Sequence, residues 1–520
     1  MTDPLPAAPV PSRRALAALA VTAIALALAL YRPWASRPFA ILDFSEFLPL
    51  LFGHQGFGSR LLALVHYYAI EHGRLNLTSY VALAAKWSFL GPNPVWWQWA
   101  RLAEMLAVVG LTYNLARRFG ASVSGAAAGA GLMIVAHTAT DAWVRQTMGE
   151  PLGLLAILAA ALVADGYRSG TDRWRLPIVA VLVVTAILAK EMLLGAVPLV
   201  MVAAVARDRD GRLAPPDTGP RSRRFVGWVS GAALLSLAAV AWVAHGAGGG
   251  GFGASYGAAN VSAGRFAWLW QTILVPAGLR PGLDTWLLPA NLALLIVVVL
   301  GFAASWRVAG TRPHLVGILA LGLGLPAIGA ALYVPWPYFN LFYGLPFLVG
   351  PAMLLATAVT GLTGTSLTRA AAIAGVVVVL AGAGGDSAHL ATASAARQQV
   401  DHGVALALGS AGGDSVIVFE PYLPQQAWQG TGATLVRYAV AMHLADSLPP
   451  ANDLPCGKAA AAIQAGGGRH TFITYSDRCG VFRNTSRRIR SKYRYLDLSG
   501  IHTDTLEADI LAPLTPVTGQ

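Results

Sequence analysis

Charged side chains are scarce in this sequence, and those at the ends of its apolar segments are the first candidates for chemistry. Two carboxylates, Asp43 and Glu46, follow the first apolar segment, and Glu150 stands at the start of a later one. Lys190 and Glu191 interrupt another apolar stretch. Carboxylates accept protons and an ammonium group binds anions, so the set suits acid and base catalysis beside a bound anion. The surrounding segments must then bring these residues to one place.

The composition indicates whether water or lipid surrounds those segments. Of the 520 residues, 55% are hydrophobic and 12% are charged, and the mean hydropathy is +0.56. A soluble domain carries about a quarter of its residues as charges, so this chain needs a lipid bilayer as partner. The net charge of +12 would suggest nucleic acid in a soluble protein. Because most arginines lie in connecting loops, membrane topology explains the charge better, and no nucleic acid partner is expected.

The apolar segments predict a polytopic α-helical membrane protein with about eleven transmembrane helices, since about 20 apolar residues cross a bilayer and fewer suffice where it thins. The first segment follows Arg13 and Arg14 and also resembles a signal peptide. However, the stretch from Tyr31 to Trp34 (YRPW) is a poor cleavage site, so we interpret the segment as the first span. The predicted spans are 14–31, 98–117, 121–139, 150–165, 175–189, 191–206, 225–245, 286–306, 314–334, 340–360 and 368–384.

The orientation follows from the arginines, because short loops rich in Lys and Arg are retained in the cytoplasm. Every second loop is basic, which places the amino terminus inside and everything after the last span outside. Two observations leave an alternative open. Arg32 and Arg37, outside the first span, equal Arg13 and Arg14 in number, and a single long helix over 175–206 would reverse all later spans. Two crossings that turn at Lys190 and Glu191 fit the basic loops on both sides better.

The sequence divides into a membrane domain, 1–384, and a C-terminal domain, 385–520, expected outside the membrane. The C-terminal domain alternates apolar runs with helical patterns and predicts a small α/β fold. Its predicted strands are 414–420, 470–475 and 493–498, and its predicted helices are 434–447 and 457–465. The two cysteines of the chain, Cys456 and Cys479, both fall here and predict a disulfide in an oxidising compartment. Two unrelated buried thiols are the alternative.

The longest outer connection, 32–97, is too long to be a simple connector. Its residues 59–72 have the apolar spacing of a helix lying in the membrane interface, as do residues 266–276 in a later connection. Tryptophans at 96, 97 and 99 predict an aromatic belt at the outer boundary. Further charged candidates on this side are His66, Arg74, Asp141 and Arg145. His66 and His72, six residues apart, do not share a helical face, so zinc is not expected there.

At this point the sequence resembles the GT-C superfamily of membrane glycosyltransferases, particularly the protein mannosyltransferase and aminoarabinose transferase-like branch. The resemblance consists of an acidic residue after the first span (Asp43), the long outer loop, and a second acidic residue, Glu150, in TMGEPL at 147–152. It extends to Lys190 in LAKE at 188–191 and to YFNLFYGLP at 338–346. The sequence departs from the family at Glu150, where Asp is usual, and in the last segment, where Tyr338 stands and the expected Arg is missing.

The resemblance implies inverting transfer of a sugar from a polyprenyl-phosphate donor to an acceptor in the cell envelope: a glycan, a glycolipid or a protein. Asp43 would then be the base, with Glu46 as a second candidate. Glu150 would orient the acceptor or hold a divalent metal ion, and Lys190, beside Glu191, would bind the carrier phosphate. Each has a structural alternative. Asp43 could pair with a nearby arginine, Glu150 stabilises a helix start in any case, and Lys190 could extend to the lipid headgroups.

The expected location is the inner membrane of a bacterium, with the C-terminal domain periplasmic or extracellular. Two other functions stay open: a lipid or glycan transporter or flippase, and a non-catalytic protein of polysaccharide assembly. A transporter would place polar groups and broken helices near the middle of the bilayer. Most of the predicted spans have uninterrupted apolar centres, and the acidic residues gather on one side. An enzyme is therefore the favoured function.

Overall fold

The fold was analysed in a computed structural model of the chain. It describes residues 12–31, 47–145, 147–167, 174–206, 213–214, 216–246, 261–274, 287–307, 311–335, 341–362, 373–378, 381, 416–420, 451–453, 470–474 and 493–497. The predicted helices at 434–447 and 457–465, both cysteines, and the candidates Asp43, Glu46 and Tyr338 lie outside these residues.

Each predicted span before residue 362 coincides with a helix or a pair of consecutive helical segments. The long helices are α1 (Arg13–Tyr31), α6 (Pro94–Arg118), α7 (Val123–Val135), α9 (Glu150–Tyr167), α10 (Arg175–Ala189), α11 (Val197–Val205), α12 (Pro220–Gly246), α14 (Leu287–Trp306), α15 (Arg312–Tyr333) and α16 (Val349–Gly361). Of the last predicted span, 368–384, the structure describes only short helical pieces at 373–378 and 381.

Shorter elements connect the long helices. They are α3 (Phe47–Phe52), α4 (Phe57–Leu64), the π-helix η2 (Val65–Glu71), α5 (Leu77–Leu90), α8 (His137–Val144), the 3₁₀ helix η3 (Glu191–Ala196), α13 (Ala263–Leu274) and the 3₁₀ helix η6 (Leu341–Leu348). The predicted interfacial helices at 59–72 and 266–276 are thus helical, as α4 with η2 and as α13. The π-helical turns of η2 were not predicted.

Five described helical segments are long and apolar enough to cross a membrane, and the bent pair α7 and α8 raises the number to six. The remaining predicted spans are shorter helices, such as α10, or carry charges, as α6 does at Arg101 and Glu104. The protein is therefore a helical, polytopic membrane protein. The full number of about eleven crossings stays a prediction, because it also depends on residues outside the described part.

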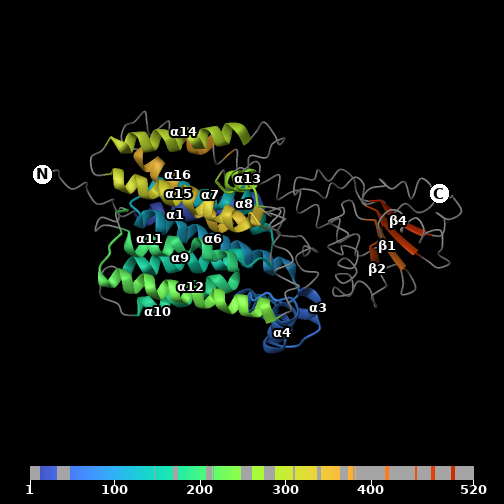
Figure 1. The fold of residues 1–520 in the computed structure, drawn as a ribbon. Coiled ribbons are helices and arrows are strands. Elements are labelled where there is room, and N and C mark those ends of the chain that lie inside the picture. The colour runs from blue at the N-terminus through green and yellow to red at the C-terminus, as the bar shows by residue number, and fades with distance from the viewer. Residues whose placement is uncertain are drawn as a thin grey trace.

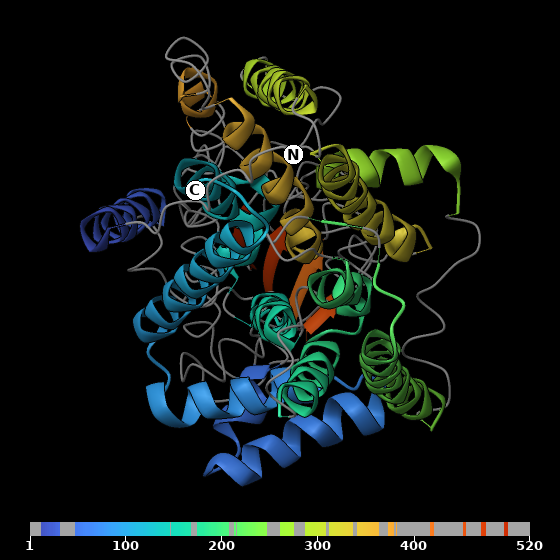
Figure 2. The same cartoon turned by 90° about the vertical axis from the view of Figure 1, so that its left-hand side faces the viewer.

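The long helices lie side by side with roughly parallel axes (Figure 1). A view along the bundle shows α1, α12 and α14 on its outside (Figure 2). These helices present apolar side chains outward, including Val21, Leu235, Trp242 and Val299. Outward apolar surface of this kind matches a lipid solvent, in which no polar face is needed.

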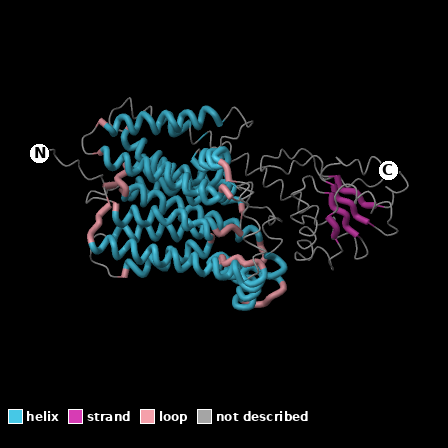
Figure 3. Tube along the Cα trace, in the orientation of Figure 1, coloured by secondary structure: helices cyan, strands magenta, loops and turns pink. Residues whose placement is uncertain are grey.

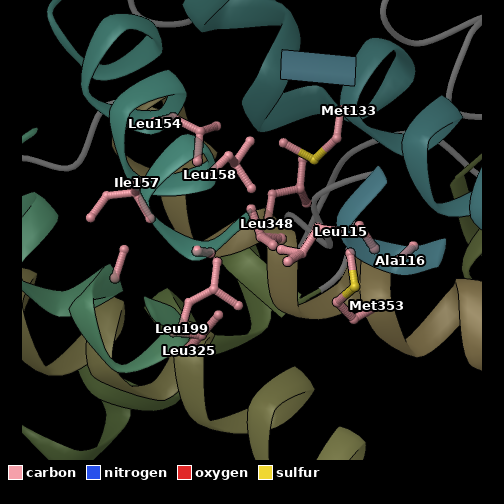
Figure 4. Close-up of a cluster of buried hydrophobic side chains, with 14 of the residues drawn as sticks. Leu115, Ala116, Met133, Leu154, Ile157, Leu158, Leu199, Leu325, Leu348 and Met353 are labelled. Carbon is pink, nitrogen blue, oxygen red and sulfur yellow. The ribbon is translucent and has the colours of Figure 1, made fainter. Parts of the chain in front are cut away.

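The centre of the bundle is apolar. Leu115 from α6, Met133 from α7, Leu158 from α9 and Leu348 from η6 meet in one buried cluster (Figure 4). Glycines allow two helices to approach closely here: a Cβ at Gly129 of α7 would collide with the backbone carbonyl of Ala352 in α16. Small residues at such contacts let helix backbones pack tightly in membranes. The core therefore depends on small residues as much as on large ones.

The tryptophans at the start of α6 correct one prediction. Trp96 and Trp99 are exposed, as expected of an aromatic belt, but Trp97 is only 1% exposed. Its indole N–H donates to the carbonyl of Gly91 over 3.0 Å, and Asn93 caps the helix by accepting from the backbone N–H of Val95. Trp97 is therefore packed inside the protein, where it fixes the turn between α5 and α6, and is not part of an exposed belt.

The break at Lys190 separates two helical segments. The α-helix α10 ends at Ala189, Lys190 is extended, and the chain continues through η3 into α11. Both α10 and α11 pack along α9. This agrees with two crossings that turn at Lys190 and Glu191, and not with one long helix over 175–206.

Within the described part of the chain, the strands occur only after residue 415 (Figure 3). Strands β1 (Val416–Glu420), β2 (Ala451–Asp453), β3 (His470–Thr474) and β4 (Tyr493–Asp497) form a parallel sheet in the order β2-β1-β3-β4. Three of them coincide with predicted strands. The short β2 (AND) was missed because it lacks an apolar pattern. Parallel neighbours need crossover connections of a dozen residues or more, and the connections 421–450, 454–469 and 475–492 are long enough.

The packing of α7 on α16 predicts different effects for two glycines. Gly129→Ala should lower the melting temperature of the detergent-purified protein, because its Cβ meets a backbone carbonyl; overpacking of this kind costs about 1–3 kcal/mol. Gly110→Ala, in α6, meets nothing within 4 Å and should leave the melting temperature unchanged or raise it. Equal melting temperatures for both variants would contradict this account of the contact.

Candidate active site

The structure brings two predicted residues together at one end of the bundle. The Nζ atom of Lys190 lies 3.7 Å from Oε1 of Glu150. The Glu150 side chain is 1% exposed and that of Lys190 is 19% exposed. Glu150 is the first residue of α9, and Lys190 directly follows the last residue of α10. Because α9 and α10 pack together with the start of one beside the end of the other, the two side chains meet.

A tight backbone contact holds the two chain segments in place. The Ser79 hydroxyl, from α5, donates to the carbonyl of Ala189 over 2.7 Å. Gly149 fits against the same atoms, and a Cβ there would collide with Ser79 Oγ and with the Ala189 carbonyl. Only a residue without a side chain permits this approach. The residues just before Glu150 and just before Lys190 are therefore fixed against α5, which lies in the long connection 32–97.

Other charged and aromatic groups surround the pair. The Lys190 ammonium lies 5.4 Å from the centre of the Tyr343 ring, within the range of a cation–π contact. Glu191 and Arg74 are close enough for their charges to act on Lys190. Burial alone would lower the pKa of Lys190, but the carboxylates of Glu150 and Glu191 outweigh it and raise the pKa above its usual value. Lys190 is thus held as a cation.

The arrangement can bind a polar ligand. Among the described residues, neither carboxylate oxygen of Glu150 has a hydrogen-bond partner. A buried carboxylate without hydrogen bonds is costly, and a ligand hydroxyl or a water molecule would satisfy it. Beside it, Lys190 and Arg74 supply positive charge for an anion. A carboxylate that can accept a hydrogen bond from a hydroxyl group thus lies next to a cation that can bind a phosphate. A reaction between a hydroxyl group and a phosphate ester requires both groups.

A second group of charges, with Arg101 buried and Lys86 and Glu104 half-buried, lies between α5 and α6 and was not predicted from the sequence. Lys86 and Arg101 both pair with the carboxylate of Glu104, at 2.5 Å and 2.6 Å. Arg101 also donates to the carbonyl of Met148 over 3.1 Å, two residues before Glu150. Burial lowers the pKa of Lys86 below its usual value, although Glu104 opposes that shift. Two charges inside an otherwise apolar predicted span were the signal that could have identified this group.

The other predicted site residues have different positions. His66 pairs with Glu71 at 2.9 Å on an exposed part of η2. Arg145 is half-buried at the end of α8, and the backbone of Asp141 lies in the same helix. In the segment 338–346, the ring of Tyr343 lies near the Lys190 ammonium. Tyr338 lies outside the described residues, so its predicted role stays a prediction.

Metal binding has little support among the described residues. No group of three or more His, Cys, Asp or Glu side chains there is arranged to hold a metal ion. Glu150 already has the ammonium of Lys190 at 3.7 Å as its counter-charge, and that cation would repel a second one. A divalent ion at Glu150 is therefore not supported by its surroundings.

The fold and the site define a class of protein: a helical membrane protein with a buried carboxylate, an adjacent cation and further charges at one end of its bundle. No family profile and no curated sequence matches the chain. Among solved structures, it is similar to ArnT from Cupriavidus metallidurans bound to undecaprenyl phosphate, with a TM-score of 0.51 and 11% identity. The match covers 87% of this chain and 92% of that chain. The chain therefore shares the fold of that structure, which agrees with the resemblance seen in the sequence.

The Glu150 and Lys190 pair predicts coupled effects on stability. Lys190→Met leaves Glu150 buried without a counter-charge, which costs about 3–5 kcal/mol for such pairs, so the melting temperature should fall. Glu150→Gln added to Lys190→Met should restore part of the loss, because no charge then remains unpaired. Thermal unfolding of the purified variants measures both changes. Additive losses in the double variant would show that the two side chains do not interact.

Proposed function

We propose that the protein is a glycosyltransferase that moves a sugar from a polyprenyl-phosphate donor to an acceptor in the cell envelope. The observation that carries the proposal is the buried Glu150 and Lys190 pair, located at one end of a bundle with the fold of ArnT. The ArnT structure contains undecaprenyl phosphate, a polyprenyl phosphate. A carrier of the same chemistry is the natural donor for this chain.

Lys190 is the main contact proposed for the carrier phosphate. Its ammonium is held as a cation, the charge of Arg74 acts on it, and the centre of the Tyr343 ring lies 5.4 Å from it. A desolvated ammonium next to a phosphate stabilises the negative charge that develops as the sugar leaves. Glu150 keeps Lys190 in place and offers unpartnered oxygens to a hydroxyl group of the acceptor or of the sugar.

The proposed chemical step is a single displacement with inversion at the anomeric carbon. The oxygen of the acceptor hydroxyl forms a bond to that carbon as the bond from the carbon to the phosphate oxygen breaks. The acceptor proton passes to Asp43, the predicted base, and the electron pair of the broken bond stays with the polyprenyl phosphate. The products are the glycosylated acceptor and the free lipid phosphate, and no other reactant is needed.

The proposed sidedness follows from the basic loops. With the amino terminus in the cytoplasm, Glu150, Lys190 and the C-terminal domain lie on the outer face of a bacterial inner membrane. There an oxidising compartment would allow the disulfide between Cys456 and Cys479. The parallel sheet of the C-terminal domain would then take part in recognising the acceptor, whose identity is a glycan, a glycolipid or a protein.

The position of the buried charges favours an enzyme over a transporter. A transporter binds its substrate near the middle of the bilayer, at breaks within helices. Here Glu150 begins α9 and Lys190 follows the end of α10, so the pair lies at the ends of two helices. The middle of the bundle, by contrast, is filled by apolar side chains such as Leu158 and Leu199.

Transfer from a radiolabelled polyprenyl-phosphate sugar to candidate acceptors, by the purified protein in liposomes, tests the proposal. Asp43→Asn should lower the rate of transfer about a hundredfold or more, as expected for a general base. Lys190→Gln should weaken binding of undecaprenyl phosphate about tenfold to a hundredfold, the effect of losing one charged hydrogen bond. Asp165→Asn, which removes an ion pair with the exposed Arg118, is the matched control and should change neither value.

Unchanged transfer by folded Asp43→Asn protein would remove Asp43 from the mechanism. Unchanged phosphate binding by Lys190→Gln would remove Lys190 from the donor site. Absence of transfer by the wild type with any donor and acceptor would favour a transporter or an assembly protein.

A further inference from the structure

The ion group formed by Lys86, Arg101 and Glu104 is unusual because removing its charges from water costs free energy. Arg101 is 2% exposed, and its Nε atom has no hydrogen-bond partner among the described residues. Glu104 is 14% exposed and Lys86 is 18% exposed. Buried ions lose hydration that their mutual attraction only partly offsets, so such a group adds little net stability compared with apolar residues of the same size. A role other than stability would account for it.

The contacts of Arg101 indicate that role. One end of its guanidinium, Nη1, binds Glu104 within α6, and the other, Nη2, binds the carbonyl of Met148. The planar guanidinium group can hold both contacts at once in a fixed geometry, which a flexible ammonium cannot do. Glu104 in turn is held by Lys86 from α5. The position of the Met148 carbonyl is thus linked to both α5 and α6.

The turn that contains Met148 leads directly to Glu150. Gly149 is enclosed by Ser79 Oγ and the carbonyl of Ala189, so the turn has little room on its other side. The charge of Arg101 also acts on Glu150 itself. A shift of the Met148 carbonyl would therefore move Glu150 relative to Lys190.

We propose that Arg101, oriented by Glu104 and Lys86, is a positioning residue that fixes the turn 147–149 and so sets the distance from Glu150 to Lys190. The expected effect of Arg101 on the rate of transfer rests on the proposed transferase function. Its structural consequence, the coupling of Glu150 to Lys190, does not depend on any activity. Arg101 touches neither carrier nor acceptor; it acts through the backbone of Met148 and Gly149.

The conservative variant Arg101→Lys tests the proposal, because lysine keeps the charge and loses the two-ended contact. The first measurement is the recovery of melting temperature when Glu150→Gln is added to Lys190→Met. In the wild-type background this recovery should be clear. In the Arg101→Lys background it should fall to less than half, since the pair is no longer held together. An undiminished recovery would overturn the proposal, whatever the activity of the protein.

The second measurement is the kinetics of transfer with the polyprenyl-phosphate sugar. Arg101→Lys should lower kcat about tenfold to a hundredfold, as a small misplacement of a catalytic group does, while KM for the donor stays within about threefold. A purely stabilising role would leave kcat of the folded protein unchanged, and this result would also overturn the proposal. If the wild type has no transfer activity, the proposed function is wrong. The recovery of melting temperature still shows whether Arg101 positions Glu150 relative to Lys190.

Two further variants complete the test: one replaces Arg101→Lys if that variant does not fold, and the other is a control. Glu104→Gln keeps the size of the side chain and removes the anion that orients Arg101, so it should reproduce the loss of kcat and of coupling if Arg101→Lys does not fold. Arg118→Lys is the matched control. Arg118 pairs with Asp165 over 3.6 Å and links the same two helices, α6 and α9, at their other ends, with 67% of its side chain exposed. This variant should change neither kcat nor coupling.

Discussion

The burial of Glu150 beside Lys190 is the interaction on which the arrangement of this protein depends. In a bundle surrounded by lipid, an ionised carboxylate with 1% exposure persists only beside a counter-charge. That requirement places the start of α9 against the end of α10, and it demands Gly149 where the two chains touch. The helices can meet this requirement because both charged residues stand at helix ends, where the intrahelical hydrogen bonds are already incomplete. The apolar core formed by the described residues then contains no charges to pair and stabilises the bundle by van der Waals packing alone.

Much of the membrane part could be predicted from the sequence. Lipid offers no hydrogen bonds to the backbone, so a long apolar segment has almost no alternative to a helix, and each predicted span before residue 362 contains one. Glu150 and Lys190 could be singled out from the sequence, because charges at the ends of apolar segments are rare and costly, but their pairing was not predicted. The prediction that residues 175–206 form two passes agrees with the break at Lys190.

What the sequence did not reveal depends on contacts between distant segments. The ion group at Arg101 escaped notice because Arg101 and Glu104, three residues apart on one helix, resemble an ordinary surface pair; only the packing of α5 and of Met148 shows that they are buried. Trp97 looked like its exposed neighbours Trp96 and Trp99 for the same reason. Strand β2 is defined by its pairing with β1, and its residues carry no apolar pattern of their own.

The charges of the two groups together favour an anionic ligand at this end of the bundle. Around Lys190, the carboxylates of Glu150 and Glu191 balance the cations of Lys190 and Arg74. Among the described residues, the neighbouring group has two cations, Lys86 and Arg101, for one carboxylate, so one positive charge is in excess there. In a medium of low dielectric constant that excess acts over a longer distance than it would in water. A phosphate that enters beside Lys190 would neutralise it, whereas a metal ion would add to it, so the charges of the described residues suit an anionic ligand better than a cation.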